Sequence, residues 1–248
     1  MPSYQSERHL EARALPSSGI FGRKQMNLKL FPERIERGFT LIEIMIVLVV
    51  ATVLAGFAIP KYLTIRDSLR ASGDVRSLAD FTGQAKLRAA SDFTHARVYA
   101  DLGGNAFQLE VWYKAGNSGS GCWVVDSDPT NTCITFTSSA PSGAVVNLSQ
   151  GNTFGYGALT AGPTAGQTTI GQAAKCLDNS ATAINNTACI VFNSRGIPIN
   201  ASTLAPVATD ALYLTNGTVV DGVTISATGS LQTWSASANA SLTTWYSQ

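Results

Sequence analysis

The longest apolar stretch of the chain runs from residue 39 to residue 59 and contains a single charged residue, Glu43. As an α-helix rising 1.5 Å per residue it would be about 31 Å long, which matches the hydrocarbon core of a bilayer. A carboxylate inside such a span is costly and by default marks a function. The pattern therefore predicts a membrane-spanning helix over residues 39–60, with Glu43 as a functional residue.

Beyond this span the pattern becomes amphipathic. Apolar residues recur at steps of three and four among charged ones, which predicts that the helix continues over residues 61–90 with one buried stripe. Proline removes a backbone donor and clashes with the preceding turn, so Pro60 is predicted to kink the helix. The predicted stripe consists of Ile65, Leu69, Val75, Leu78, Phe81, Ala85 and Ala89.

Residues 91–248 show short alternating runs separated by Gly, Asn, Asp and Ser, a pattern typical of antiparallel strands. Gly103-Gly104 and Asn216-Gly217 are good hairpin turns. The predicted fold class is α+β, with the long N-terminal helix packed on an antiparallel sheet. The predicted strands are Ala96–Leu102, Ala106–Tyr113, Cys122–Val125, Cys189–Phe192, Ala211–Leu214, Val219–Ser226 and Leu231–Trp234.

The segment from Ser138 to Gln172 is rich in Ser, Thr, Gly and Ala and contains no charged residue. Its length and low complexity predict a mobile surface insertion, with short strands near Val145 and Phe154. The alternative is that its aromatic residues Phe154 and Tyr156 form a contact patch.

Charge sets the expected orientation in the membrane. Residues 1–38 hold seven Lys/Arg against four Asp/Glu, whereas the remainder holds ten against twelve. The positive-inside rule therefore predicts a cytoplasmic N-terminus and an exported globular domain. Only 13% of residues are charged and the net charge is +1, so no nucleic acid is expected as a partner.

The four cysteines, Cys122, Cys133, Cys176 and Cys189, all follow the apolar span. They lack the spacing and the nearby histidines of a zinc or redox motif. Structural disulfides in an oxidising compartment are therefore expected. Three connectivities are possible, and sequential pairing is favoured.

Few residues are suited to catalysis. The only histidines are His9 and His95, so a serine or cysteine nucleophile would lack a base. Asp126 and Asp128 precede Pro129 and indicate a turn rather than a calcium site, because too few acidic residues cluster nearby. We expect no enzyme activity, no catalytic residue, no cofactor and no metal.

The sequence from Arg37 to Glu43, Arg-Gly-Phe-Thr-Leu-Ile-Glu, resembles the prepilin cleavage and methylation motif of type IV pilins and type II secretion pseudopilins. The resemblance implies cleavage between Gly38 and Phe39 by a prepilin peptidase and N-methylation of Phe39. It also implies that Glu43 pairs with the amine of a neighbouring subunit during assembly. The leader would be residues 1–38, which is long for this family; a true start at Met26 would give a short basic leader.

A looser resemblance concerns the globular part. The stretches 188–196 and 223–229, each ending in Gly, resemble those of H-type pseudopilins and related minor pilins. Some relatives that take up DNA carry basic residues after the second Gly, but here Ser230-Leu231-Gln232 follows, and no Lys or Arg occurs after Arg195.

Together these resemblances imply a minor pilin or pseudopilin of a type IV pilus or a type II secretion system. It would be anchored by one span in the bacterial inner membrane, with a periplasmic globular domain, and would then enter the fibre. The implied partners are the prepilin peptidase, other pilin or pseudopilin subunits and the inner-membrane assembly platform. A major pilin and a membrane-anchored adhesin or ligand-binding module remain the alternatives.

Overall fold

A computed structural model describes residues 38–136, 145–163, 166–167, 169–239 and 244–248. The chain divides into two units, Met1–Val49 and Val50–Gln248. The predicted leader, apart from Gly38, lies outside the described residues, as do Met26 and the side chain of Pro60. The predicted kink at Pro60 and the division of the chain into leader, span and globular domain stay predictions.

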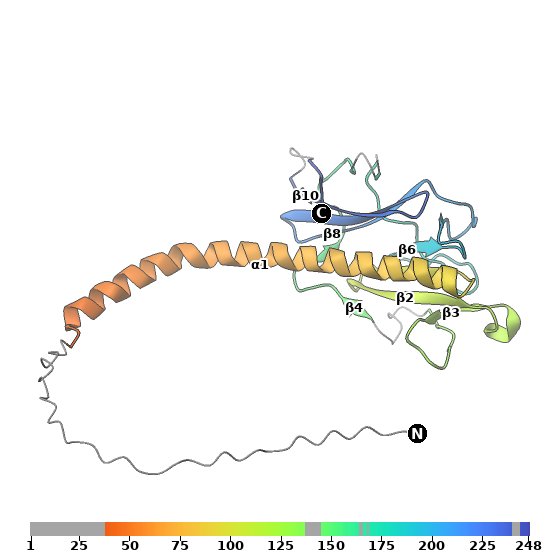
Figure 1. Ribbon diagram of the computed structural model, residues 1–248, viewed down its shortest axis with the longest axis horizontal. Coiled ribbons are helices and arrows are strands. Elements are labelled where there is room, and N and C mark those ends of the chain that lie inside the picture. The colour runs from red at the N-terminus through yellow and green to blue at the C-terminus, as the bar shows by residue number, and fades with distance from the viewer. Residues whose placement is uncertain (1–37, 137–144, 164–165, 168, 240–243) are drawn as a thin grey trace, which may run out of the picture. The chain divides into compact units, whose positions relative to one another are not determined.

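One long helix precedes all the strands (Figure 1). Helix α1 covers Leu41–Ser91, close to the predicted bounds. The 3₁₀ turn Asn117–Gly119 lies between β2 and β3. The strands are β1 (Ala96–Asp101), β2 (Ala106–Tyr113), β3 (Cys122–Val125), β4 (Val146–Asn147), β5 (Thr153–Phe154), β6 (Thr187–Phe192), β7 (Pro198–Ile199), β8 (Thr209–Thr215), β9 (Val219–Ser226), β10 (Leu231–Ser237) and β11 (Tyr246–Ser247).

The strands of the second unit form two antiparallel sheets in the described residues, where the sequence predicted one. The first sheet has the order β3-β2-β1-β6-β7, with β4 also pairing with β2. The second has the order β11-β10-β9-β8-β5. In Figure 1, β2 and β3 of the first sheet lie below α1, and β10 of the second sheet lies above it. The α+β layout is confirmed.

Helix α1 joins the two sheets through one hydrophobic core. Its residues Ala71, Val75 and Leu78 are fully buried there with inward-facing residues of both sheets. Val98 and Ile190 come from the first sheet, and Leu212 and Val223 from the second. Burial of apolar side chains on this scale is the main stabilising term in a domain of this size.

The predicted helix stripe is correct only in its C-terminal part. Val75, Leu78, Ala85 and Ala89 are buried and Phe81 is partly buried, but Ile65 and Leu69 are 60% and 67% exposed. Ile65 and Leu69 are four residues apart and share one face, but Leu69 precedes Val75 by six residues, which places it about 120° around the helix from the buried stripe. The step of six breaks the three-to-four pattern, so the seven predicted residues do not form a single stripe.

The predicted surface insertion contributes to the core. Among its described residues, Leu159 and Ile170 are buried on the outer face of the second sheet with Tyr213. The Gln172 side chain also bonds Tyr213, accepting from its backbone N–H at 2.8 Å and donating to its carbonyl at 2.7 Å. A few apolar residues suffice to cover one sheet face. Because they lie among many Ser, Thr and Gly residues, the sequence pattern did not reveal that this segment covers the second sheet.

Candidate functional site

The described part of the first unit begins with the predicted cleavage site. Gly38, Phe39 and Thr40 precede the helix and are exposed. Thr40 caps α1: its Oγ1 accepts from the Glu43 backbone N–H at 3.3 Å, and its carbonyl accepts from the Ile44 N–H at 3.3 Å. The sequence reasoning missed this role, although Thr-x-x-Glu is the spacing of a capping box.

Glu43 lies in the first turn of α1 and is exposed. A carboxylate there interacts favourably with the positive end of the helix dipole. Cleavage after Gly38 would place a new amine on Phe39, four residues before Glu43. Glu43 therefore has two roles that can be tested separately. It stabilises the first turn of the helix, and its negative charge is available to a partner.

The helix that follows Thr40 has an apolar surface that the rest of the described chain leaves exposed. Phe39 and Leu41 are 78% and 79% exposed, and the apolar residues that follow up to Ile59 are exposed as well. This part of α1 is long and apolar enough to cross a membrane. Such a surface needs lipid or other apolar helices around it, so the helix indicates membrane anchoring.

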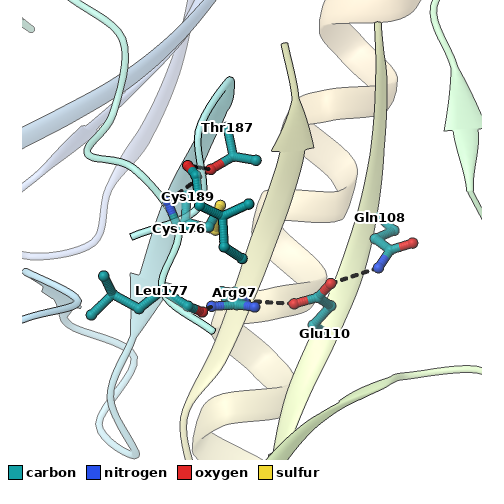
Figure 2. The surroundings of a disulfide bond; sticks show 8 residues. Arg97, Gln108, Glu110, Cys176, Leu177, Thr187 and Cys189 are labelled. Carbon is teal, nitrogen blue, oxygen red and sulfur yellow. Dashed lines mark hydrogen bonds and ion pairs between the residues drawn. A yellow bond between two sulfur atoms is a disulfide. The ribbon is translucent and has the colours of Figure 1, made fainter. Parts of the chain in front are cut away.

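A buried ion pair lies on the outer face of the first sheet (Figure 2). Arg97 of β1 and Glu110 of β2 are cross-strand partners, with Nε and Oε2 2.6 Å apart and both side chains fully buried. Glu110 also accepts from Gln108 at 2.6 Å, and the Arg97 guanidinium lies 3.9 Å from the centre of the Trp123 ring. Burial raises the pKa of Glu110, while the Arg97 guanidinium opposes this shift.

Neither charged side chain of this cluster has any exposed surface. Its cover is the segment from Cys176 to Cys189, which a disulfide closes. The Arg97 Nη1 donates to the Leu177 carbonyl at 2.6 Å, so the cover is bonded directly to the ion pair (Figure 2). The cluster is therefore a structural element of the globular domain.

The structure pairs the cysteines sequentially, Cys122 with Cys133 and Cys176 with Cys189. The first bridge closes the loop after β3. The second joins the cover of the ion pair to β6, where Cys176 and Cys189 are both buried. Each constrains a short loop of the unfolded chain, a restriction that typically contributes about 2–4 kcal/mol.

The two Gly-ending stretches singled out in the sequence meet at Lys86 of α1. The Lys86 ammonium donates to the Gly229 carbonyl at 2.8 Å. Both Gly196 and Gly229 have positive φ, +70° and +75°, and a Cβ on Gly229 would come within 2.5 Å of the Gly196 carbonyl oxygen. Glycine is therefore required at both positions by conformation and by packing.

The other acidic and basic candidates have local roles. Asp126 pairs with Arg88 at 2.7 Å, and Asp128 accepts from the backbone of Thr130 and Thr132 within a turn. Burial, together with the charge of Lys114, lowers the pKa of His95. Within the described residues, no group of three His, Cys, Asp or Glu side chains is placed to hold a metal ion.

Comparison with known families agrees with the local geometry of the N-terminal segment. The model of the family described as "prokaryotic N-terminal methylation motif" matches residues 34–59. This range contains the predicted cleavage site, Thr40, Glu43 and the apolar run. The motif supports a type IV pilin-like protein of the kind that is processed by prepilin peptidase and assembled with other subunits, and so points to a structural protein. Neither the curated proteins nor the solved structures gave a match.

Proposed function

We propose that this protein is a structural subunit, a minor pilin or pseudopilin, of a type IV pilus or a type II secretion pseudopilus. The observation that carries the proposal is an uncovered apolar helix that starts at the methylation motif and bears one carboxylate, Glu43. The partners are the prepilin peptidase, the inner-membrane assembly platform and other subunits. Before assembly the chain spans the inner membrane once, with its globular domain in the periplasm.

The surroundings of Gly38 support cleavage after this residue. A Cβ built on Gly38 would meet nothing within 4 Å, and its φ lies outside the left-handed region. Among the described residues, neither crowding nor backbone conformation therefore requires glycine here. A peptidase that needs a small residue at an exposed bond accounts for it.

Assembly then follows from the cost of a lone charge in an apolar environment. Cleavage creates an amine on Phe39, which the same peptidase methylates. In a fibre of staggered subunits, Glu43 of one subunit pairs with the amine of its neighbour, so both charges are neutralised where the apolar helices pack together. A subunit out of register would leave Glu43 unpaired, so the pair sets the register of the fibre.

The globular domain favours a minor subunit of the H type. The resemblance there rests on the stretches that end in Gly196 and Gly229, and these two turns pack on each other and on Lys86. Deletion of the gene is expected to abolish secretion or piliation. Normal fibres together with normal secretion would contradict a role in initiating or modifying the fibre.

The first test is mass spectrometry of the N-terminal peptide from sheared fibres and from membranes. We expect a methylated peptide that begins at Phe39. Recovery almost entirely from the membrane fraction favours a pseudopilin or minor pilin, whereas abundance in the sheared fraction favours a major pilin. An uncut N-terminus in both fractions would refute the proposal and leave a membrane-anchored binding module.

A set of substitutions separates the two contributions of Glu43. Glu43→Gln keeps a residue type that suits the capping box but removes the charge, whereas Thr40→Val removes the cap and keeps the charge. We expect Glu43→Gln and Glu43→Leu to abolish incorporation into fibres, and Thr40→Val to reduce it only partly. Normal incorporation of Glu43→Gln would show that the charge is not needed.

A further inference from the structure

A polar cavity of about 250 Å³ lies beside α1 shortly after the apolar span. Arg66, Asp67 and Arg70 of the helix form one side, and the loop 150–152 and Asn216 form the other. Arg66 follows the last residue of the apolar run, Ile59, by seven positions, or about 10 Å along a helix. Lipid headgroups extend roughly 5–8 Å beyond each side of the hydrocarbon core.

The side chains bring the cavity closer to the membrane than their backbone positions indicate. Helical Cα–Cβ bonds tilt toward the N-terminus of the helix, which for Arg66 and Arg70 is the direction of the apolar span. Arginine also carries its charge at the end of a long flexible stem. The Arg66 guanidinium can therefore reach the headgroup region, whereas Arg70 lies one helical turn, or about 6 Å, farther from the hydrocarbon core.

The lining of the cavity holds two arginines and one aspartate, a net charge of +1, and the Asp74 carboxylate lies behind its Asn152 wall. Asp67 is shared by both arginines, at 3.3 Å from Arg66 and 3.8 Å from Arg70. The three side chains are 43%, 48% and 36% exposed for Arg66, Asp67 and Arg70, so these are weak surface pairs. One carboxylate does not satisfy two guanidinium groups, and their remaining N–H donors are suited to phosphate oxygens.

The opposite wall is held in place by hydrogen bonds. Asp74 of α1 accepts from the Ser149 backbone N–H at 2.7 Å and from the Asn152 side-chain amide at 2.6 Å. The Asn216 amide donates to the Asp67 carbonyl at 3.3 Å. Gly151 has a φ of +93° with open space around it. The loop is thus tied to the helix at both of its ends, and the cavity between them is formed by the fold.

We propose that this cavity binds the phosphate-bearing headgroup of an anionic phospholipid in the leaflet next to the globular domain. Basic pockets of membrane proteins are known to bind anionic lipid headgroups. The bound lipid would hold the globular domain against the membrane while the subunit waits for assembly, and it would be released when the helix leaves the bilayer. The inference rests on the membrane-anchored state of the proposed function, but not on cleavage or on fibre formation.

The test uses the full chain, released from micelles that contain equal amounts of phosphatidylglycerol and phosphatidylcholine, with native mass spectrometry to count the lipids retained. We expect the wild type to retain phosphatidylglycerol preferentially. Arg66→Gln/Arg70→Gln is expected to lower that preference roughly thirty-fold. Asp67→Asn is expected to raise it about five-fold, because it frees both guanidinium groups. A merely structural role of these residues would not give opposite signs.

The matched control is Lys175→Gln/Arg195→Gln, which removes the same charge from two exposed positions elsewhere in the globular domain. It should keep the wild-type preference. An unchanged preference in the Arg66/Arg70 variant, or an equal loss in the control, would overturn the proposal. So would displacement of the lipid by inorganic phosphate, which would assign the cavity to a free anion. A chain that keeps the lipid preference but is never cut at Gly38 would refute the proposed function and leave this inference standing.

Discussion

Replacing Glu110 by Gln tests how much the buried ion pair contributes to the stability of the globular domain. Both Arg97 and Glu110 have no exposed side-chain surface, so the substitution leaves an uncompensated guanidinium in the interior. Breaking a buried pair in this way typically costs 3–5 kcal/mol. Gln can still accept one hydrogen bond from Arg97, which is worth about 1 kcal/mol. We therefore expect Glu110→Gln to lower the free energy of unfolding by about 2–4 kcal/mol.

The assay is denaturant unfolding of the full chain in detergent micelles, followed by tryptophan fluorescence because Trp123 lies against Arg97. The matched control is Asp126→Asn, which breaks an ion pair of similar length, 2.7 Å to Arg88, but with 47% and 24% of the two side chains exposed. Asp126→Asn should lower the free energy of unfolding by less than about 1 kcal/mol. A loss below about 1 kcal/mol for Glu110→Gln would refute the reasoning.

A double substitution completes this test. Arg97→Met/Glu110→Leu removes both charges and keeps most of the buried volume. Since an apolar replacement of a buried pair is often neutral or stabilising, the double variant should be more stable than Glu110→Gln alone. A double variant that is as unstable as the single one would show that packing around the pair, and not its charge balance, carries the effect.

Three further perturbations have expected outcomes. Gly229→Ala forces a residue with φ of +75° against the Gly196 carbonyl and should cost about 1–3 kcal/mol in thermal unfolding; no change would contradict the close packing of the two turns. Burial raises the pKa of Asp210 to about 7, so its stabilising contribution is complete below about pH 4 and is lost as the pH rises to 7. Asp210→Asn should therefore raise the free energy of unfolding at pH 8 but not at pH 4, and an equal effect at both would exclude titration of this group. Cys176→Ala/Cys189→Ala should lower the free energy of unfolding by more than the about 2–4 kcal/mol typical of losing a disulfide, because it also frees the segment that covers the ion pair. The loss should also exceed that of Cys122→Ala/Cys133→Ala. Calorimetry of the two variants measures both losses, and equal losses would contradict this role of the cover.

The parts of the molecule that follow from the sequence are those whose cause is local. The observed bounds of β2, β3 and β9 equal the predicted ones, because alternation over four to eight residues is a strong signal. Strands β7 and β11 have only two residues each, too few for any period to show. The candidate site follows the same rule: Gly38, Phe39 and Glu43 form a contiguous motif, whereas the cavity at Arg66 needs residues 150–152 and 216 to be brought to the helix.

The Arg97–Glu110 pair shows where local signals end. A turn centred between Gly103 and Gly104 pairs residues whose numbers sum to 207, so the predicted hairpin already places Arg97 opposite Glu110, as the register has it. Opposite charges facing each other on a strand pair are normally read as an exposed cross-strand pair. What buries them is the segment carrying Leu177, which lies eighty residues beyond Arg97 and is held there by the Cys176–Cys189 bridge. The partner is thus set by the four-residue turn 102–105, but the energetic importance of the pair depends on a distant disulfide. This makes the oxidising compartment expected from the cysteines a condition for a stable globular domain.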